Sequence, residues 1–201
     1  MDKEYWEKYY KEARLITAPS QFAVFVVENF SLSGNLIELG CGNGRDTAYF
    51  ASHGLNVLGI DQCNNSVNRL NELNIVNAKF EKDDFTNLNS QRKFDNIYSR
   101  FTLHSVNVES ERRTIKWAAK AINGGFFAIE VRSTKDDFFG KGKLIKKNTW
   151  FTDHARRFVD FKEIKDTLIK NGFSIIFEKE SRGLAPYRNE DPVVIRIIAK
   201  K

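Results

Sequence analysis

The stretch Glu38-Leu39-Gly40-Cys41-Gly42-Asn43-Gly44 joins a short apolar run to a segment with the pattern of a helix. Residues 36–39 are typical of a buried strand, and the residues from Arg45 onward predict a helix. Glycines at a strand-to-helix turn permit positive φ and let a ligand approach the backbone closely. The following helix N-terminus offers N–H groups without intrahelical partners. The stretch therefore predicts a ligand-binding turn.

Strand-like and helix-like segments alternate along the rest of the chain. The expected strands are 36–39, 56–60, 78–81, 94–98, 126–131, 173–179 and 193–199, and the main helices are 21–29, 64–73, 109–122 and 160–170. This alternation predicts an α/β fold with a doubly wound, mostly parallel sheet and helices on both faces. The last two strands lack a crossover helix, so they should pair antiparallel. The expected sheet has seven strands with the last one reversed.

Two segments lie outside this alternating pattern. Residues 1–30 predict an N-terminal helical cover, with an aromatic stripe between Tyr5 and Arg14. Residues 132–153 are polar, basic and without a clear period, which favours a long active-site loop or insertion. The length of 201 residues suits a single domain, residues 1–201.

The composition limits the possible partners. With 41% hydrophobic and 29% charged residues, the chain is typical of soluble globular proteins. No apolar run approaches the roughly 20 residues that span a bilayer, and the charged N-terminus lacks a signal-peptide core, so we expect a cytoplasmic protein without a membrane partner. Cys41 and Cys63 are too sparse for a disulfide scaffold or a zinc site, so no metal is expected. The net charge of +6 permits an anionic partner without specifying one.

Acidic residues end the second and third expected strands. Asp61 lies 21 residues after Gly40, the distance at which a carboxylate can accept from both ribose hydroxyls. Dinucleotide-binding enzymes use Gly-x-Gly-x-x-Gly, whereas here the third glycine comes one position early. Glu38 would repel a pyrophosphate and suits a ligand that carries a positive charge. The glycine spacing thus disfavours a nicotinamide oxidoreductase.

These motifs, together with Asp84-Phe85, resemble those of class I (Rossmann-like) S-adenosylmethionine-dependent methyltransferases from Gln21 to Lys200. The resemblance implies S-adenosylmethionine as cofactor and S-adenosylhomocysteine as product. It implies that Glu38 and the turn hold the methionine moiety, that Asp61 takes the ribose, and that Asp84 with the Phe85 N–H contacts adenine. Whether Asp83 or Asp84 makes the adenine contact stays open. The implied cofactor residues are Glu38, Gly40, Cys41, Gly42, Gly44, Asp61, Gln62, Asp83, Asp84 and Phe85.

Cationic side chains follow the fourth and fifth strands, where the acceptor of the methyl group would lie. Arg100 and His104 are the candidate catalytic residues, and Arg132 ends the fifth strand. Because arginine suits carboxylates and phosphates, we expect a small anionic acceptor, with oxygen as the favoured atom. An anionic oxygen needs no general base, whereas a hydroxyl or amine would make His104 the candidate base. Further candidates for acceptor binding from flanking segments are Tyr5, Tyr10, Arg14, Arg182, Tyr187 and Arg188.

Several functions remain open at this point. A loose resemblance connects the chain to small enzymes of bacterial surface-polysaccharide pathways, including those that methylate phosphate or phosphoramidate oxygens. The basic charge allows RNA methylation, although the sequence has no Asn-Pro-Pro-Tyr or Asp-Pro-Pro-Tyr motif. A non-catalytic cofactor-binding or interaction module on the same fold is a further alternative. The sequence does not indicate the oligomeric state.

Overall fold

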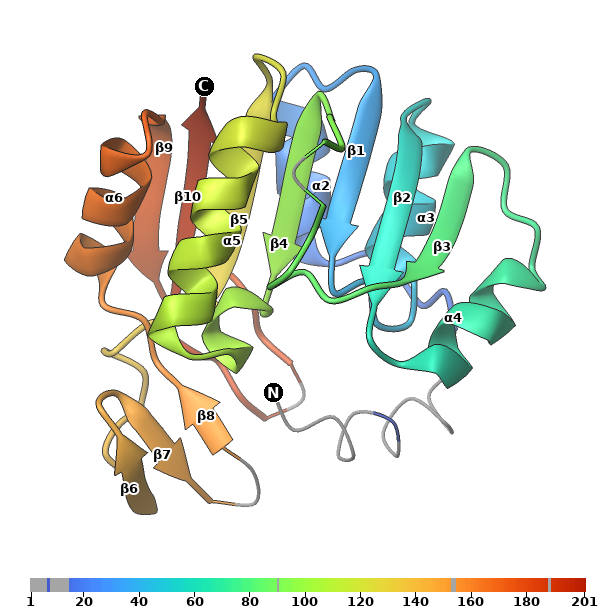
Figure 1. The fold of residues 1–201 in the computed structure, drawn as a ribbon. Helices are drawn as coiled ribbons and strands as arrows, with labels where there is room; N and C mark the ends of the chain where they lie inside the picture. Colours follow the sequence, from blue (N-terminus) through green and yellow to red (C-terminus); the bar gives the residue numbers. More distant parts are fainter. Residues whose placement is uncertain (1–6, 8–14, 90, 153–154, 188) are drawn as a thin grey trace.

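A seven-stranded sheet forms the centre of the protein (Figure 1), shown as a computed structural model that describes residues 7, 15–89, 91–152, 155–187 and 189–201. Its strands are β1 (Asn35–Leu39), β2 (Asn56–Asp61), β3 (Ala78–Lys82), β4 (Asn96–Arg100), β5 (Phe126–Arg132), β9 (Ser174–Ser181) and β10 (Val194–Lys200). The strand order is β3-β2-β1-β4-β5-β10-β9. Only β10 runs antiparallel to its neighbours, β5 and β9. The predicted fold class, with its reversed last strand, is confirmed.

Helices cover both faces of this sheet, as predicted. They are α2 (Gln21–Asn29), α3 (Arg45–Ser52), α4 (Asn64–Asn71), α5 (Val108–Ala121) and α6 (Phe161–Lys170), with a short 3-10 turn η1 (Leu103–Ser105) after β4. Side chains alternate along a strand, so Ile37 and Ile97 face α5 and α6 while Leu36 and Tyr98 face α2 and α3. Each face of the sheet therefore packs into its own hydrophobic core.

Side-chain caps explain where helices α5 and α6 begin. The Asn107 side chain accepts a hydrogen bond from the Ser110 N–H at the start of α5, over 2.8 Å. The Asp160 side chain accepts from the Glu163 N–H at the start of α6, over 2.9 Å. Both contacts satisfy N–H groups that have no partner inside the helix. The two helix starts are thereby fixed beside the segment that follows β5.

The segment 132–153, which we expected to be an irregular loop or insertion, contains regular structure. Three short antiparallel strands, β6 (Lys143–Lys146), β7 (Thr149–Phe151) and β8 (Ala155–Arg157), form a second sheet that extends past residue 153. Figure 1 shows this sheet projecting from the end of the molecule where the parallel strands terminate. All residues of β6 are exposed, so no alternation of apolar and polar residues marks it in the sequence.

The expected N-terminal cover is described only in part. Helix α2 packs Phe22 and Val26 into the core, and it follows the N-cap residue Ser20, whose hydroxyl accepts from the Ala23 N–H over 3.1 Å. The helix expected between Tyr5 and Arg14 lies outside the described residues, apart from Glu7. Among the described helices, none has the length and apolar character required to cross a bilayer.

Candidate active site

The glycine turn between β1 and α3 has a conformation that requires glycine. Gly40, Gly42 and Gly44 have φ angles of 74°, 53° and 77°. A Cβ atom on Gly40 would lie 2.3 Å from Cγ2 of Thr102, in the loop after β4, and one on Gly44 would lie 2.5 Å from Cδ2 of Leu70. The Gly40 and Cys41 N–H groups both donate to the Ile60 carbonyl, over 2.8 and 2.9 Å. The turn is thus held against three neighbouring elements.

Asp61, at the end of β2, is bonded directly to this turn. Its Oδ2 accepts from the Gly42 N–H over 2.9 Å, and its Oδ1 accepts from the Cys63 N–H over 2.8 Å. Burial raises the pKa of the Asp61 carboxyl, and N–H groups of Cys63, Gly42 and Gln62 partly oppose that rise. A carboxylate can accept about four hydrogen bonds. Asp61 therefore joins the turn to α4 and keeps capacity for hydroxyl donors.

The N-terminal segment reaches the same place through Glu7. Its Oε1 accepts from the Asn64 N–H at the start of α4, and its Oε2 contacts Cys63 Sγ, both over 3.1 Å. Segments far apart in the sequence thus meet beside Asp61.

Glu38 lies beneath the turn. Its side chain faces α3, where the Thr47 hydroxyl donates to Glu38 Oε2. The residue is only 4% exposed, and burial, followed by the nearby Asp46 carboxylate, holds the pKa of Glu38 well above its usual range. A cationic ligand above the turn would stabilise the ionised form of this carboxyl.

The acids after β3 differ in their surroundings. Asp83 Oδ1 accepts from the Asp84 N–H over 2.8 Å, and its Oδ2 lies 3.6 Å from Arg92. Asp84 Oδ1 accepts from both the N–H and the hydroxyl of Thr86, over 2.9 and 2.8 Å. The Phe85 side chain is buried. Because Arg92 offsets the charge of Asp83, Asp84 is the better candidate for an adenine contact.

On the acceptor side, Arg100 is committed to a buried ion pair. Its Nε lies 2.9 Å from Glu130 Oε1, and Glu130 Oε2 accepts from Arg196 Nε over 2.7 Å. Burial raises the pKa of Glu130 although both arginines oppose that rise. The Arg100 guanidinium also lies 4.4 Å from the centre of the Phe101 ring. From the sequence, we expected the Arg100 guanidinium to be available to the acceptor. In the structure, this guanidinium is instead paired with Glu130.

His104 lies in η1 and is bonded to the end of β5. The backbone N–H of Arg132 donates to His104 Nδ1 over 3.2 Å. A backbone N–H can only donate, so Nδ1 is the acceptor and the hydrogen of the neutral ring is on Nε2. The Phe101 ring lies 5.2 Å from the imidazole, and Phe101 has a φ of 55°, a strained value for a bulky residue. The Phe101 ring, which we did not predict, thus lies beside both His104 and the Arg100 guanidinium.

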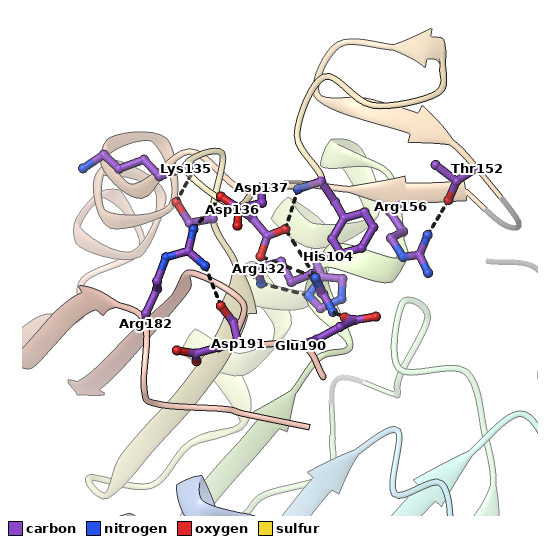
Figure 2. Close-up of polar contacts among 12 residues, drawn as sticks. His104, Arg132, Lys135, Asp136, Asp137, Thr152, Arg156, Arg182, Glu190 and Asp191 are labelled. Atoms are coloured by element: carbon purple, nitrogen blue, oxygen red, sulfur yellow. Dashed lines mark hydrogen bonds and ion pairs between the residues drawn. The ribbon is translucent and has the colours of Figure 1, made fainter. Parts of the chain in front are cut away.

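Two further candidate arginines, Arg132 and Arg182, also have carboxylate partners (Figure 2). Arg132 Nη2 lies 2.6 Å from Glu190 Oε2 and its Nη1 lies 3.4 Å from Asp136 Oδ1. Arg182 pairs with Asp137 and donates to the Asp191 carbonyl. We did not predict these acids because they come from segments with no regular period. The acceptor edge is therefore a mixed-charge surface.

Not all predicted acceptor residues can be placed. Tyr187 is 55% exposed and exchanges backbone hydrogen bonds of 2.8 and 3.0 Å with Glu190, the partner of Arg132. Tyr5, Tyr10, Arg14 and Arg188 lie outside the described residues.

The strand order, the reversed β10 and the glycine turn together define a Rossmann-like methyltransferase fold. A sequence model described as a methyltransferase domain matches residues 5–177, so the chain belongs to this family. It is an S-adenosylmethionine-dependent methyltransferase, which confirms the cofactor and the enzyme class expected from the sequence. No curated protein matched the chain.

Solved structures support the same fold. An S-adenosylmethionine-dependent methyltransferase from Methanosarcina mazei aligns with a TM-score of 0.73 and 19% identity over 88% of this chain and 96% of its own. The 1,6-didemethyltoxoflavin-N1-methyltransferase of Burkholderia thailandensis, with bound 1,6-didemethyltoxoflavin and S-adenosylhomocysteine, aligns with a TM-score of 0.71 and 18% identity over 90% and 76%. A glycopeptide N-methyltransferase in complex with S-adenosylmethionine aligns with a TM-score of 0.67 and 14% identity, over 94% of this chain and 97% of its own. These identities establish a shared fold.

Proposed function

We propose that the protein methylates an ionised oxygen of a small acceptor that carries one anionic group. The observation that carries this proposal is the hydrogen bond from the Arg132 N–H to His104 Nδ1, 3.2 Å long. It leaves His104 as a donor through Nε2, so the imidazole is not arranged to remove a proton. An oxygen that is already ionised needs no general base, because its attack on a sulfonium neutralises charge.

The residues around the turn fit the cofactor. Gly40 and Gly44 have positive φ angles, and a Cβ atom on either would meet Thr102 or Leu70, so glycine permits the tight turn that we assign to the cofactor. When bound, S-adenosylmethionine supplies a methyl group on a sulfonium for in-line displacement by an acceptor lone pair. We assign the ribose hydroxyls to Asp61, the adenine amino group to Asp84, and the positively charged methionine end to the turn above Glu38. The protein's contribution is then positioning and the exclusion of water.

Among the candidate arginines that the structure describes, Arg132 is the best placed for the acceptor's anionic group. Its contact with Asp136 is long, at 3.4 Å, and the side chain of its other partner, Glu190, is 42% exposed. An acceptor anion can therefore replace Glu190 with little loss, because exposed ion pairs stabilise proteins weakly. Arg100 has no such freedom, since Glu130 would be left with one cation in a buried site.

The surrounding acids limit the charge of the acceptor. Asp136, Asp137 and Glu190 lie at the same edge as Arg132 (Figure 2). These carboxylates disfavour a multiply charged molecule, so a monoanion fits better than a dianion. Phosphodiester- and phosphoramidate-bearing metabolites of surface-polysaccharide pathways are the first compounds to test, ahead of phosphate monoesters.

An acceptor screen tests the proposal. Labelled S-adenosylmethionine is incubated with matched pairs of compounds, each a carboxylate or phosphodiester and its neutral amide or ester, and with RNA. We expect label in the monoanionic members. Label in the neutral members alone would contradict the proposal, and label in RNA, with binding that weakens as salt rises, would favour RNA methylation. Binding of S-adenosylhomocysteine without any transfer would favour a non-catalytic module.

A further inference from the structure

The β6–β8 sheet contacts the 3-10 turn that carries His104. Arg157, the last residue of β8, is 6% exposed. Its Nε donates to the Val106 carbonyl over 2.6 Å and its Nη2 to the Leu103 carbonyl over 2.5 Å. The same Nη2 contacts Glu111 Oε2 in the first turn of α5. The guanidinium thus holds the carbonyls on both sides of His104.

We propose that Arg157 is a positioning residue that fixes η1 and, through it, the orientation of the His104 imidazole. The β6–β8 sheet is then part of the acceptor machinery, although it lies outside the main fold. This inference rests on the proposed function only in placing His104 at the acceptor.

The geometry favours positioning over simple packing. Glu111 alone would offset the charge of Arg157, yet the guanidinium also engages two carbonyls at the ends of a short turn, where intrahelical partners are missing. The guanidinium reaches these three acceptors from two separate nitrogens, Nε and Nη2, held in one plane. A lysine has a single charged nitrogen and would lose part of this set.

The segment after β8 fixes the other side of His104. The Val159 N–H donates to the Arg132 carbonyl over 2.9 Å, and the Thr134 N–H donates to the Val159 carbonyl over 3.0 Å. Arg132 is the residue whose N–H bonds to His104 Nδ1. Strand β8 and the residues after it therefore constrain the imidazole in two ways. Arg157 acts through η1, and Val159 acts through the end of β5.

The β6–β7 hairpin is less closely joined to the body of the protein. A pocket of about 270 Å³ separates the β6–β7 turn from the starts of α5 and α6, and Lys147, Asn148, Arg157, Glu111 and Glu163 are among its lining residues. Across it, Lys147 forms an exposed ion pair of 2.6 Å with Glu163. This pair also connects the insertion to a helix, but it does not contact η1, so it offers a matched control.

The experiment observes His104 directly and needs no acceptor. The chain has three histidines, so ¹⁵N spectra of the imidazole rings can be assigned by substitution. In the wild type, we expect His104 to show an unprotonated Nδ1 and a protonated Nε2. The double variant Arg157→Met/Glu111→Gln removes the clamp without leaving a buried charge unpaired, and Arg157→Lys removes part of it.

Both variants should move the His104 nitrogen shifts toward the average of the two tautomers. Lys147→Met should leave them unchanged, and S-adenosylhomocysteine affinity should stay within about twofold in all three. Unchanged His104 shifts in both Arg157 variants would overturn the inference. If Arg157→Met/Glu111→Gln does not fold, Arg157→Lys decides. Failure to find an anionic acceptor would contradict the proposed function but would not alter this readout.

Discussion

The backbone N–H of Arg132 donates to Nδ1 of His104 over 3.2 Å, which joins the end of β5 to the turn that follows β4. This one contact fixes the tautomer of the imidazole and joins the two residues that we propose to face the acceptor. In the proposed function, this contact is the reason that His104 does not act as a general base. With Nδ1 accepting from Arg132, the neutral His104 ring presents an N–H donor at Nε2.

Replacing Gly40 by alanine should abolish cofactor binding. The φ of 74° is strained for alanine, and the new Cβ would lie 2.3 Å from Thr102. Gly54→Ala is the matched control, because its φ of 85° imposes a similar backbone cost, about 1–2 kcal/mol, while nothing lies within 4 Å of the new atom. Calorimetry with S-adenosylhomocysteine should show binding in Gly54→Ala alone. Equal affinities in the two variants would rule out the turn as the cofactor site.

The affinity for S-adenosylhomocysteine should fall as the pH falls through the pKa of Asp61. Burial raises this pKa, so the loss begins at a higher pH than for an exposed aspartate, whose pKa is about 3.9. The reason is that a protonated carboxyl loses acceptor capacity for the ribose hydroxyls. Asp61→Asn should bind about tenfold more weakly, the value of a hydrogen bond to a charged group, and should show no such dependence on pH. A parallel pH dependence in this variant would contradict the assignment.

Glu38→Gln should stabilise the protein while it weakens cofactor binding. The folded-state pKa of Glu38 is raised, chiefly by burial, so the ionised carboxyl costs folding free energy above that pKa and nothing below the unfolded pKa. The gain in Tm should therefore be about 2–4 °C per kcal/mol at high pH and should disappear as the pH falls. Thermal unfolding across a pH series measures it. A gain in Tm that grows as the pH falls would contradict a raised pKa of Glu38 in the folded protein.

Much of the fold could be predicted because its central strands are largely buried on both faces and end at turn residues. The expected strand 56–60 is observed as Asn56–Asp61 and the expected strand 126–131 as Phe126–Arg132. Strand 94–98 was placed two residues early, because Phe94 is apolar but pairs only as an isolated bridge with Ile122. Burial on both faces, rather than alternation, was the usable signal.

The acceptor side could not be predicted to the same degree. The sequence shows where Arg100 and Arg132 lie but not that Glu130 and Glu190 pair with them, since those contacts join distant segments. Arg157 is one of two adjacent arginines, of which only it is buried. Nothing in the local pattern distinguishes the two, because their burial depends on the tertiary position of β8.

Arg100→Met should mainly lower the stability of the protein, whereas Arg132→Met should mainly weaken acceptor binding. Arg100→Met leaves Glu130 in a buried site with Arg196 alone, so we expect a loss of about 3 kcal/mol in the free energy of unfolding. Arg132→Met removes a partly exposed pair and should cost about 1 kcal/mol or less, while it raises the KM for an anionic acceptor. Denaturant unfolding and steady-state kinetics measure the two effects. The reverse pattern would place the acceptor's anion at Arg100.

The most direct test of the central claim is the pH dependence of methyl transfer to the acceptor found in the screen, in the wild type and in His104→Gln. A glutamine amide can donate where His104 Nε2 does but cannot act as a base. We predict a rate that is constant above the pKa of the acceptor's own oxygen, and a loss of about tenfold or less in the variant. A rate that rises with deprotonation of an imidazole, and a variant without activity at any pH, would contradict the account.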